Sequence, residues 1–96
     1  MQLVYTPAAQ ADLDAIWEYT VSAWGVAQAK RYLRSIEVTG QAIAAGEKMT
    51  QPADYIRPSY RKVSVGRHTL YLITQPEQIE VVRILHQRMD VDSQLG

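Results

Sequence analysis

Two stretches with helical periodicity, separated by a single glycine, constrain the fold of this chain most strongly. Thr6 and Pro7 suit the N-cap and the first position of a helix, and Gly25 can end that helix in the left-handed conformation. Between them, residues at helical spacing form one stripe: Leu13, Ile16, Trp17, Thr20, Val21 and Trp24. This spacing predicts that one face of the helix is buried, with both tryptophans in the core.

A second helix is expected from about Val26 to Ala45. Its apolar stripe repeats at steps of four and three, at Ala29, Leu33, Ile36, Gly40 and Ile43. Gly40 costs about 1 kcal/mol relative to alanine inside a helix, which indicates a close approach to a neighbour, expected to be the first helix. Gly46 can end the second helix. Because only Gly25 separates the two stretches, we expect an antiparallel helical hairpin.

Runs of strand-forming residues lie on both sides of this hairpin. Residues 3–5 precede it, and residues 60–65, 68–74 and 78–85 follow it. Residues 47–58 lack periodicity and hold two prolines, so they are expected to form a loop. The last run has little polar face and is expected to be a central strand. The order β-α-α-β-β-β predicts one α+β domain over residues 1–96, with the helical hairpin on one face of a small, mainly antiparallel sheet.

Charge is distributed unevenly, although the formal net charge is zero. Residues 57–88 carry Arg57, Arg61, Lys62, Arg67, Arg83 and Arg88 against Glu77 and Glu80, which gives six minus two, or +4. This half of the chain indicates a face for an anionic ligand or an acidic partner, or else an ordinary solvated sheet face. Because we find no cysteine, secretory signal or membrane-length apolar run, we expect a cytoplasmic protein without a metal or other cofactor.

Four segments together resemble the RelE/ParE superfamily of toxins from bacterial toxin–antitoxin pairs. Residues 11–19 resemble the family's first helix, which is often written A-D-L-x-x-I-W-x-Y. Residues 24–29 resemble its helix junction, and residues 56–61 with 65–68 resemble the entry to its sheet and its first hairpin. Residues 82–90 are similar to the ending of the ParE branch. This resemblance covers nearly the whole chain.

The ParE branch implies a type II toxin that inhibits DNA gyrase and arrests growth. Such a toxin needs a shaped basic surface with a few aromatic and arginine anchors rather than a catalytic group. The residues that this resemblance assigns to target binding are Arg57, Arg61, Arg67, His86, Arg88 and Met89. No catalytic residue is expected in this case.

The RelE branch implies an alternative, cleavage of mRNA on the ribosome. That reaction activates the 2′-hydroxyl of the RNA, protonates the leaving oxygen and stabilises charge on the phosphate. The residues available for it are Arg61, Lys62, Arg67, His68, Arg83, His86 and Arg88. The catalytic candidates among them would be Arg61, Arg67, Arg83 and His86, but no general-base partner for His86 is evident. A third possibility is an inactive relic that only binds its antitoxin.

The resemblance also implies a ParD-like antitoxin with a ribbon-helix-helix DNA-binding part and a tail that folds onto the toxin. Residues expected to bind this antitoxin are Trp17, Lys30, Arg31, Arg34, Tyr60 and Tyr71. The basic residues among them suit an acidic tail, and the two tyrosines could instead belong to the core. Operator binding would belong to the antitoxin, so we expect neither sequence-specific DNA binding nor membrane binding by this chain.

Three further interpretations concern individual charged residues. For His86, a hydrogen bond that fixes the C-terminal turn is expected rather than a role in catalysis. Arg83 could pair with Glu80 or a C-terminal carboxylate, or could contact the target. Asp12, together with Asp14 and Glu18, is expected to form a solvated face of the first helix.

Overall fold

The computed structural model describes residues 1–89 and 94–95 and confirms the predicted α+β fold. Its elements are β1 (Gln2–Tyr5), α1 (Pro7–Trp24), α2 (Val26–Ala44), β2 (Gln51–Pro52), β3 (Tyr60–Val65), β4 (His68–Thr74) and β5 (Gln78–His86). The helices and the longer strands begin and end within one residue of their predicted bounds. The short strand β2 was missed, because two residues give no periodicity inside the predicted loop.

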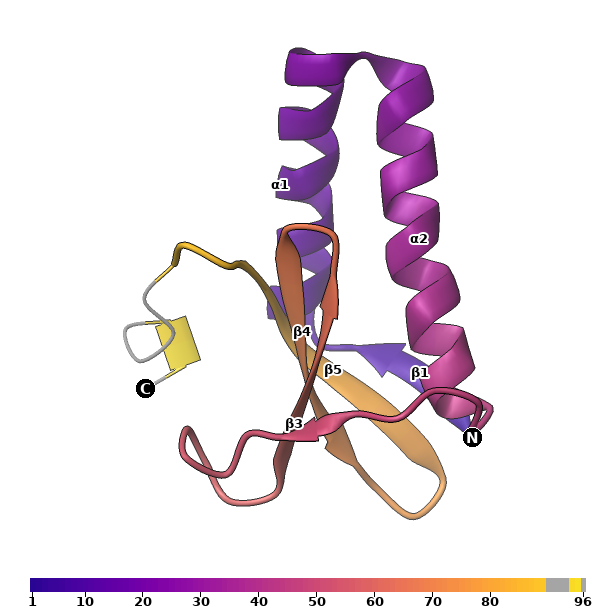
Figure 1. The fold of residues 1–96 in the computed structure, drawn as a ribbon, viewed down its shortest axis with the longest axis vertical. Coiled ribbons are helices and arrows are strands. Elements are labelled where there is room, and N and C mark those ends of the chain that lie inside the picture. The colour runs from indigo at the N-terminus through magenta and orange to yellow at the C-terminus, as the bar shows by residue number, and fades with distance from the viewer. Residues whose placement is uncertain (90–93, 96) are drawn as a thin grey trace.

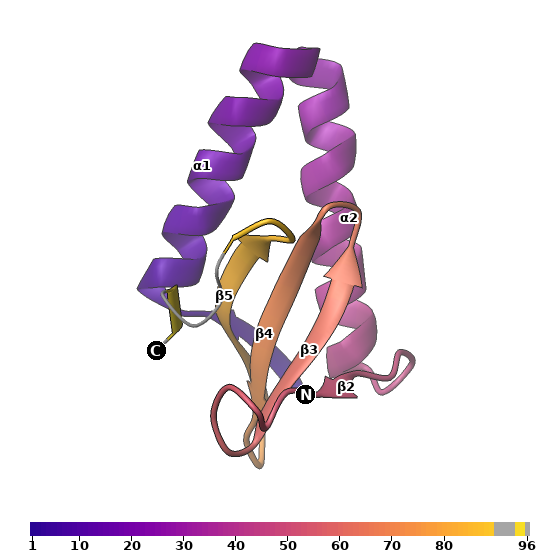
Figure 2. The same ribbon diagram turned by 60° about the vertical axis from the view of Figure 1, so that its left-hand side comes forward.

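The five strands form one mixed sheet in the order β1-β5-β4-β3-β2. The strand β1 runs parallel to β5, and all other neighbours are antiparallel. The prediction of β5 as an interior strand is therefore correct. Both helices lie against the same face of this sheet, and the turn that joins them lies farthest from it (Figures 1 and 2).

Local signals account for the ends of the helical hairpin. The Thr6 hydroxyl accepts a hydrogen bond from the Ala9 N–H at 3.0 Å, as expected of an N-cap followed by proline. Gly25 has φ = 89°, a conformation that L-residues rarely adopt, and this allows the chain to reverse between α1 and α2. Gly40 contacts β1 rather than α1, as an ideal Cβ there would lie 2.9 Å from a Leu3 methyl carbon.

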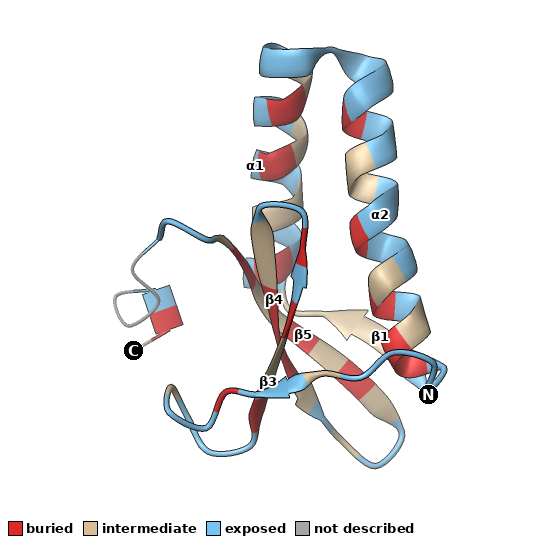
Figure 3. Ribbon diagram, viewed as in Figure 1, coloured by how far each residue is buried: buried red, intermediate tan, exposed pale blue. Residues whose placement is uncertain are grey.

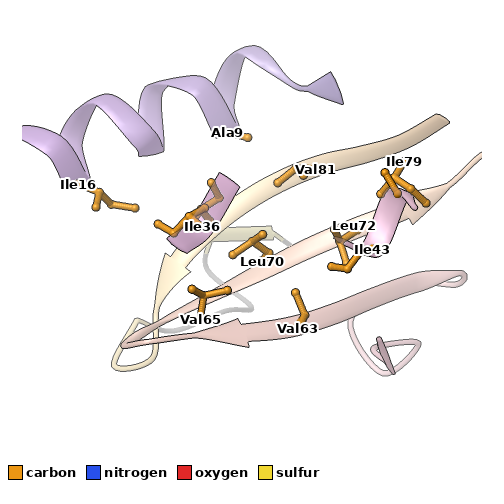
Figure 4. Packing of buried hydrophobic residues seen from close by; sticks show 12 residues of the cluster. Ala9, Ile16, Ile36, Ile43, Val63, Val65, Leu70, Leu72, Ile79 and Val81 are labelled. Atoms are coloured by element: carbon orange, nitrogen blue, oxygen red, sulfur yellow. The ribbon is translucent and has the colours of Figure 1, made fainter. Parts of the chain in front are cut away.

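The main core lies between the helices and the sheet (Figure 4). Its buried residues are Ala9, Ile16, Ile36, Ile43, Ala44, Val63, Val65, Leu70, Leu72, Ile79, Val81 and Ile84. A smaller buried cluster lies on the opposite sheet face, because its strand residues alternate with those of the main core. It consists of Ala53, Tyr60, Tyr71, Leu85 and Leu95. The sheet is therefore apolar on both faces, and the C-terminal Leu95 is part of its second core.

The expectation that both tryptophans pack in the core is wrong for Trp24, whose exposed fraction is 69%. Trp17 is half-buried. The reason is geometric, because α1 continues beyond the sheet and Trp24 is its last residue, in the exposed tip of the hairpin (Figure 3). Helical spacing identifies the stripe but not where the surface that covers it ends.

A β-bulge shifts the register between β4 and β5. Leu72 pairs with Val81, but Tyr71 pairs with Arg83, so Val82 is the extra residue. The bulge resets the alternation of side chains, and Val81 and Ile84 consequently both join the main core. It also places His86 directly opposite His68.

Where β1 ends, α1 takes over the hydrogen bonds along the outer edge of β5. The pairing of β1 with β5 ends at Tyr5 and Val81. Beyond it, the Thr6 hydroxyl donates to the Val82 carbonyl at 2.7 Å, and Asp12 Oδ2 accepts from the Ile84 N–H at 2.9 Å. The helix thus satisfies backbone groups that a neighbouring strand would otherwise satisfy.

Asp12 also pairs with Arg83, so its expected place on a solvated face is wrong. Arg83 Nε donates to Asp12 Oδ2 at 2.8 Å and Arg83 Nη2 donates to Asp12 Oδ1 at 2.9 Å. The two side chains are 22% and 15% exposed. Arg83 Nη1 additionally donates to the Gln94 carbonyl at 3.3 Å. Among the described residues, Arg83 forms its ion pair with the first helix rather than with Glu80, and the C-terminal carboxylates at 90 and 92 lie outside the described residues.

Within the described residues, neither helix combines the length and apolar character needed to cross a bilayer.

The bonds to Asp12 predict that Asp12→Ala is strongly destabilising. The substitution leaves a partly buried guanidinium and the Ile84 N–H without their acceptor, so we expect a loss of about 2–3 kcal/mol in the free energy of unfolding. Urea unfolding measures it. Asp14→Ala is the matched control, since Asp14 is exposed and, within the described part of the chain, accepts only from Gln10 of the same helix. A change of similar size there would contradict the prediction.

Candidate functional site

A mostly apolar groove of about 730 Å³ lies between α1 and the end of β5. We call it the α1–β5 groove. The helix α1 contributes Asp12, Ala15, Ile16, Tyr19, Thr20 and Trp24, and α2 contributes Gln28 and Tyr32. The sheet side contributes Gly66, Arg67, His68, Ile84, His86 and Met89. Three of its large apolar side chains are exposed, with Tyr19 at 71%, Trp24 at 69% and Met89 at 47%.

Two histidines face each other in this groove. His68 and His86 are cross-strand partners, and their rings meet edge to face with centroids 5.3 Å apart. His86 Nδ1 accepts the Arg88 N–H at 3.1 Å, and the His86 carbonyl accepts the Met89 N–H at 2.9 Å. As expected, His86 fixes the C-terminal turn. Among the described residues no three His, Asp or Glu side chains are grouped so as to hold a metal ion.

Tyr32 of α2 binds the β3–β4 turn beside these histidines. Its hydroxyl lies 2.6 Å from His68 Nδ1, accepts the Arg67 N–H at 3.1 Å and lies 3.3 Å from the Val65 carbonyl oxygen. Sequence reasoning missed Tyr32. Its position three residues after Ala29 and four before Ile36, both in the buried stripe, was the signal that could have identified it.

Burial lowers the pKa of His68 below its ordinary value, the nearby His86 lowers it further, and Asp12 opposes the shift. His68 is thus neutral at pH 7, so its Nδ1 can accept a hydrogen bond from the Tyr32 hydroxyl.

The structure brings together only part of the residues predicted to bind the target. Arg67, His86 and Met89 line the α1–β5 groove, and exposed Arg88 follows His86. Arg57 and Arg61 lie at the other end of β3. Arg61 there donates to the Thr50 hydroxyl at 2.9 Å and to the Thr50 carbonyl at 2.6 Å, and Arg57 Nε donates to the Leu95 carbonyl at 3.0 Å.

The four residues considered for mRNA cleavage do not form one site. Arg67 and His86 share the α1–β5 groove, but Arg61 binds the loop before β2 and Arg83 binds Asp12. His68 was among the residues available for cleavage, but its position opposite His86 was not predicted, because it depends on the bulge.

A second, more polar groove of about 450 Å³ lies between the two helices above β1. We call it the interhelical groove. It is lined by Tyr5, Gln10, Leu13, Trp17, Lys30, Leu33, Arg34 and Glu37. Of the residues predicted to bind the antitoxin, Trp17, Lys30 and Arg34 meet here. Burial, and secondarily Glu37, raises the pKa of Tyr5, so this groove also contains a protonated phenol at neutral pH.

The other three predicted antitoxin residues lie elsewhere. Arg31 is exposed and donates to the Gln28 side chain at 2.8 Å. Tyr60 and Tyr71 are buried in the second core, with exposed fractions of 9% and 4%.

The neutral state of His68 predicts a loss of stability below neutral pH. Its folded pKa is lowered from an unfolded value of about 6.5, so the unfolded chain binds more protons in this window. The stability that neutral His68 contributes is fully present above its unfolded pKa and is lost as the pH falls toward its folded pKa. We expect His68→Asn to reduce the slope of unfolding free energy against pH between about 7 and 5. Urea unfolding at several pH values measures this slope, and an unchanged slope in the variant contradicts the prediction.

Comparison with known proteins places this chain in a family. A family model described as "ParE toxin of type II toxin-antitoxin system, parDE" matches residues 3–91. Toxin ParE1 of Mycobacterium tuberculosis (strain ATCC 25618 / H37Rv) is 50% identical over 91 residues, covering 94% of this chain and 93% of that protein. Toxin ParE1 of Caulobacter vibrioides is 39% identical over 88 residues, covering 92% and 91%. Toxin ParE of Escherichia coli is 34% identical over 94 residues, covering 97% and 91%.

A solved structure described as "Chromosomal ParDE TA system from P. aeruginosa" contains a chain with the same fold. Its TM-score is 0.76 at 23% sequence identity, and the match covers 90% of this chain and 95% of that one. With half of the residues shared with one curated relative and the family model matching almost throughout, this chain belongs to the ParE toxins of type II toxin–antitoxin systems.

Proposed function

We propose that this ParE-family toxin inhibits DNA gyrase in the cytoplasm, arrests growth, and is neutralised by a ParD-like antitoxin with a ribbon-helix-helix part. The observation that supports it best is the α1–β5 groove, where exposed aromatic side chains adjoin Arg67. Aromatic residues and arginine are the side chains that most often dominate the energy of protein interfaces. The proposed inhibition therefore proceeds by binding.

The exposure of Trp24 supports a contact role. An indole that is 69% exposed leaves apolar surface in water, and a partner that covers it gains the corresponding free energy. Tyr19 and Met89 extend the same surface across the groove. Asp12, the acidic residue in the lining, is already paired with Arg83, so it does not oppose an acidic partner as a free charge would.

One observation favours the alternative of mRNA cleavage. The edge-to-face pair of His68 and His86 could in principle exchange protons with a bound RNA. Against it, Arg61 and Arg83, the cations that would stabilise phosphate charge, are held by Thr50 and Asp12. Binding without catalysis remains the better-supported proposal.

The interhelical groove is the proposed site of the antitoxin. Trp17 and Leu33 give it an apolar floor, and Lys30 and Arg34 give it a cationic rim. These features suit an amphipathic, acidic segment that folds on binding. The two grooves lie on different sides of α1, so substitutions can test them separately.

The proposed gyrase contact predicts that Trp24→Ala weakens inhibition of supercoiling. Loss of a central anchor typically costs about 2 kcal/mol, or roughly 30-fold in the inhibitory concentration. Tyr55→Ala is the matched control, since Tyr55 is an aromatic residue with 71% exposure that does not line the groove. A gyrase supercoiling assay measures both variants.

Two outcomes would contradict the proposal. If Trp24→Ala and Tyr55→Ala weakened inhibition equally, inhibition would not depend on the α1–β5 groove. A wild-type protein that leaves supercoiling unchanged but cuts ribosome-bound mRNA would establish the alternative. Point substitutions are preferable to a C-terminal truncation, because truncation also removes Leu95 from the second core.

The proposed antitoxin site predicts that Arg34→Glu weakens antitoxin binding by at least about tenfold while gyrase inhibition is retained, because it reverses a charge at the groove rim. Arg31→Glu, one turn away and outside the groove lining, should have a smaller effect. Calorimetry with a cognate ParD-like antitoxin measures both. If Arg31→Glu proved the more damaging, the antitoxin would occupy another face of α2.

A further inference from the structure

We propose that Tyr32 is the positioning residue of the toxic contact surface. Its hydroxyl fixes the β3–β4 turn on α2 and thereby sets where Arg67, His86 and Met89 stand, so that it acts through these three residues. The inference rests on the proposed function only in taking the α1–β5 groove as the surface that contacts the target.

The Tyr32 hydroxyl contacts more than one residue of the turn. A tyrosine hydroxyl has one hydrogen to donate and can accept through its oxygen. The Arg67 N–H donates to it at 3.1 Å. Its own hydrogen can go to the Val65 carbonyl at 3.3 Å, and His68 Nδ1 lies 2.6 Å from the same oxygen, as donor or acceptor according to the tautomer of the ring. Two successive residues of the turn are therefore tied to a single atom of α2.

The aromatic ring restrains the same turn from the side. Gly66 has φ = 57°, and an ideal Cβ there would lie 2.6 Å from Tyr32 Cε1 and 2.8 Å from its hydroxyl oxygen. The ring also lies 5.6 Å from the His68 ring, centroid to centroid. The turn thus packs on the phenol with no room for a side chain at Gly66.

The turn in turn holds the end of β5. The Gln87 N–H donates to the Arg67 carbonyl at 3.0 Å, and Gln87 Nε2 donates to the Gly66 carbonyl at 3.2 Å. Together with the contact between His68 and His86, these bonds connect Tyr32 to the turn that presents Met89. A displacement of the β3–β4 turn would therefore move the sheet side of the α1–β5 groove, including Met89.

Tyr32→Phe tests this role by deleting the hydroxyl and keeping the ring. We expect growth arrest on expression to weaken at least tenfold, in terms of the inducer needed, with the protein still folded. In NMR spectra we expect the His68 titration to change, because its Nδ1 loses the Tyr32 hydroxyl, and the Arg67 amide to exchange faster. Tyr55→Phe is the matched control, because it also deletes a hydrogen-bonded hydroxyl, one that accepts from Lys62 Nζ at 2.8 Å, away from the groove.

Gly66→Ala gives an independent test, because its methyl group would displace the Tyr32 ring. Gly46→Ala is its control, as Gly46 also has a positive φ of 77° but no atom within 4 Å of an added Cβ. We expect toxicity to fall for Gly66→Ala beyond any loss of folded protein, and to persist for Gly46→Ala. Full toxicity of either Tyr32→Phe or Gly66→Ala overturns the inference, as does a toxicity loss with the His68 titration and Arg67 exchange unchanged.

Parallel gyrase assays separate the two proposals. If Tyr32→Phe relieves growth arrest while the wild-type protein leaves gyrase untouched, the gyrase proposal fails and the positioning role of Tyr32 stands. If Tyr32→Phe inhibits gyrase as well as the wild-type protein does, the positioning role fails and the gyrase proposal stands.

Discussion

The hydrogen bonds from α1 to the outer edge of β5 are the constraint on which the rest of the structure depends. The strand β1 covers only the first part of β5, and beyond Val81 the edge would be open. Thr6 and Asp12 close it by binding the Val82 carbonyl and the Ile84 N–H. Because an unpaired strand edge exposes backbone polar groups, these contacts fix the start of α1 against the sheet and so orient the whole helical hairpin.

These contacts, to Val82 and Ile84, lie at the β-bulge. The bulge determines which side chains form the candidate site. Without the bulge, the alternation of side chains would continue from Val81 and direct Ile84 and His86 to the second face. With it, Ile84 closes the main core and His86 meets His68 beside Tyr32. Bulges commonly redirect side chains in this way. The α1–β5 groove therefore owes its composition to one inserted residue in an interior strand.

The helical hairpin separates two surfaces of different character. On one side of α1 lies the larger and mostly apolar groove with exposed Trp24 and Tyr19, and on the other lies the interhelical groove with its rim of Lys30 and Arg34. Both are suited to binding macromolecular partners. A toxin that must recognise a target and also be neutralised by a second protein requires surfaces of this kind more than it requires reactive groups.

The sequence by itself determined the elements and the fold class. Helical spacing, the Thr6-Pro7 start and the glycines at 25 and 66 act within a few residues of the chain, so α1, α2 and the longer strands could be predicted almost to the residue. The six basic residues at 57–88 are evident from the sequence, but Arg67 is the one of the six that lines the α1–β5 groove in the described structure.

Only the tertiary structure decided which distant residues meet. Asp12 reads as part of a polar helix face, and its partner Arg83 lies 71 positions away. Continuing the register from Thr74 and Ile79 would pair His68 with Leu85, and only the bulge replaces Leu85 by His86. Trp24 keeps the spacing of a core residue but lies where the sheet no longer covers the helix. Periodicity along a chain is a local property, whereas register shifts, edge contacts and the extent of the covering surface depend on how whole elements pack together.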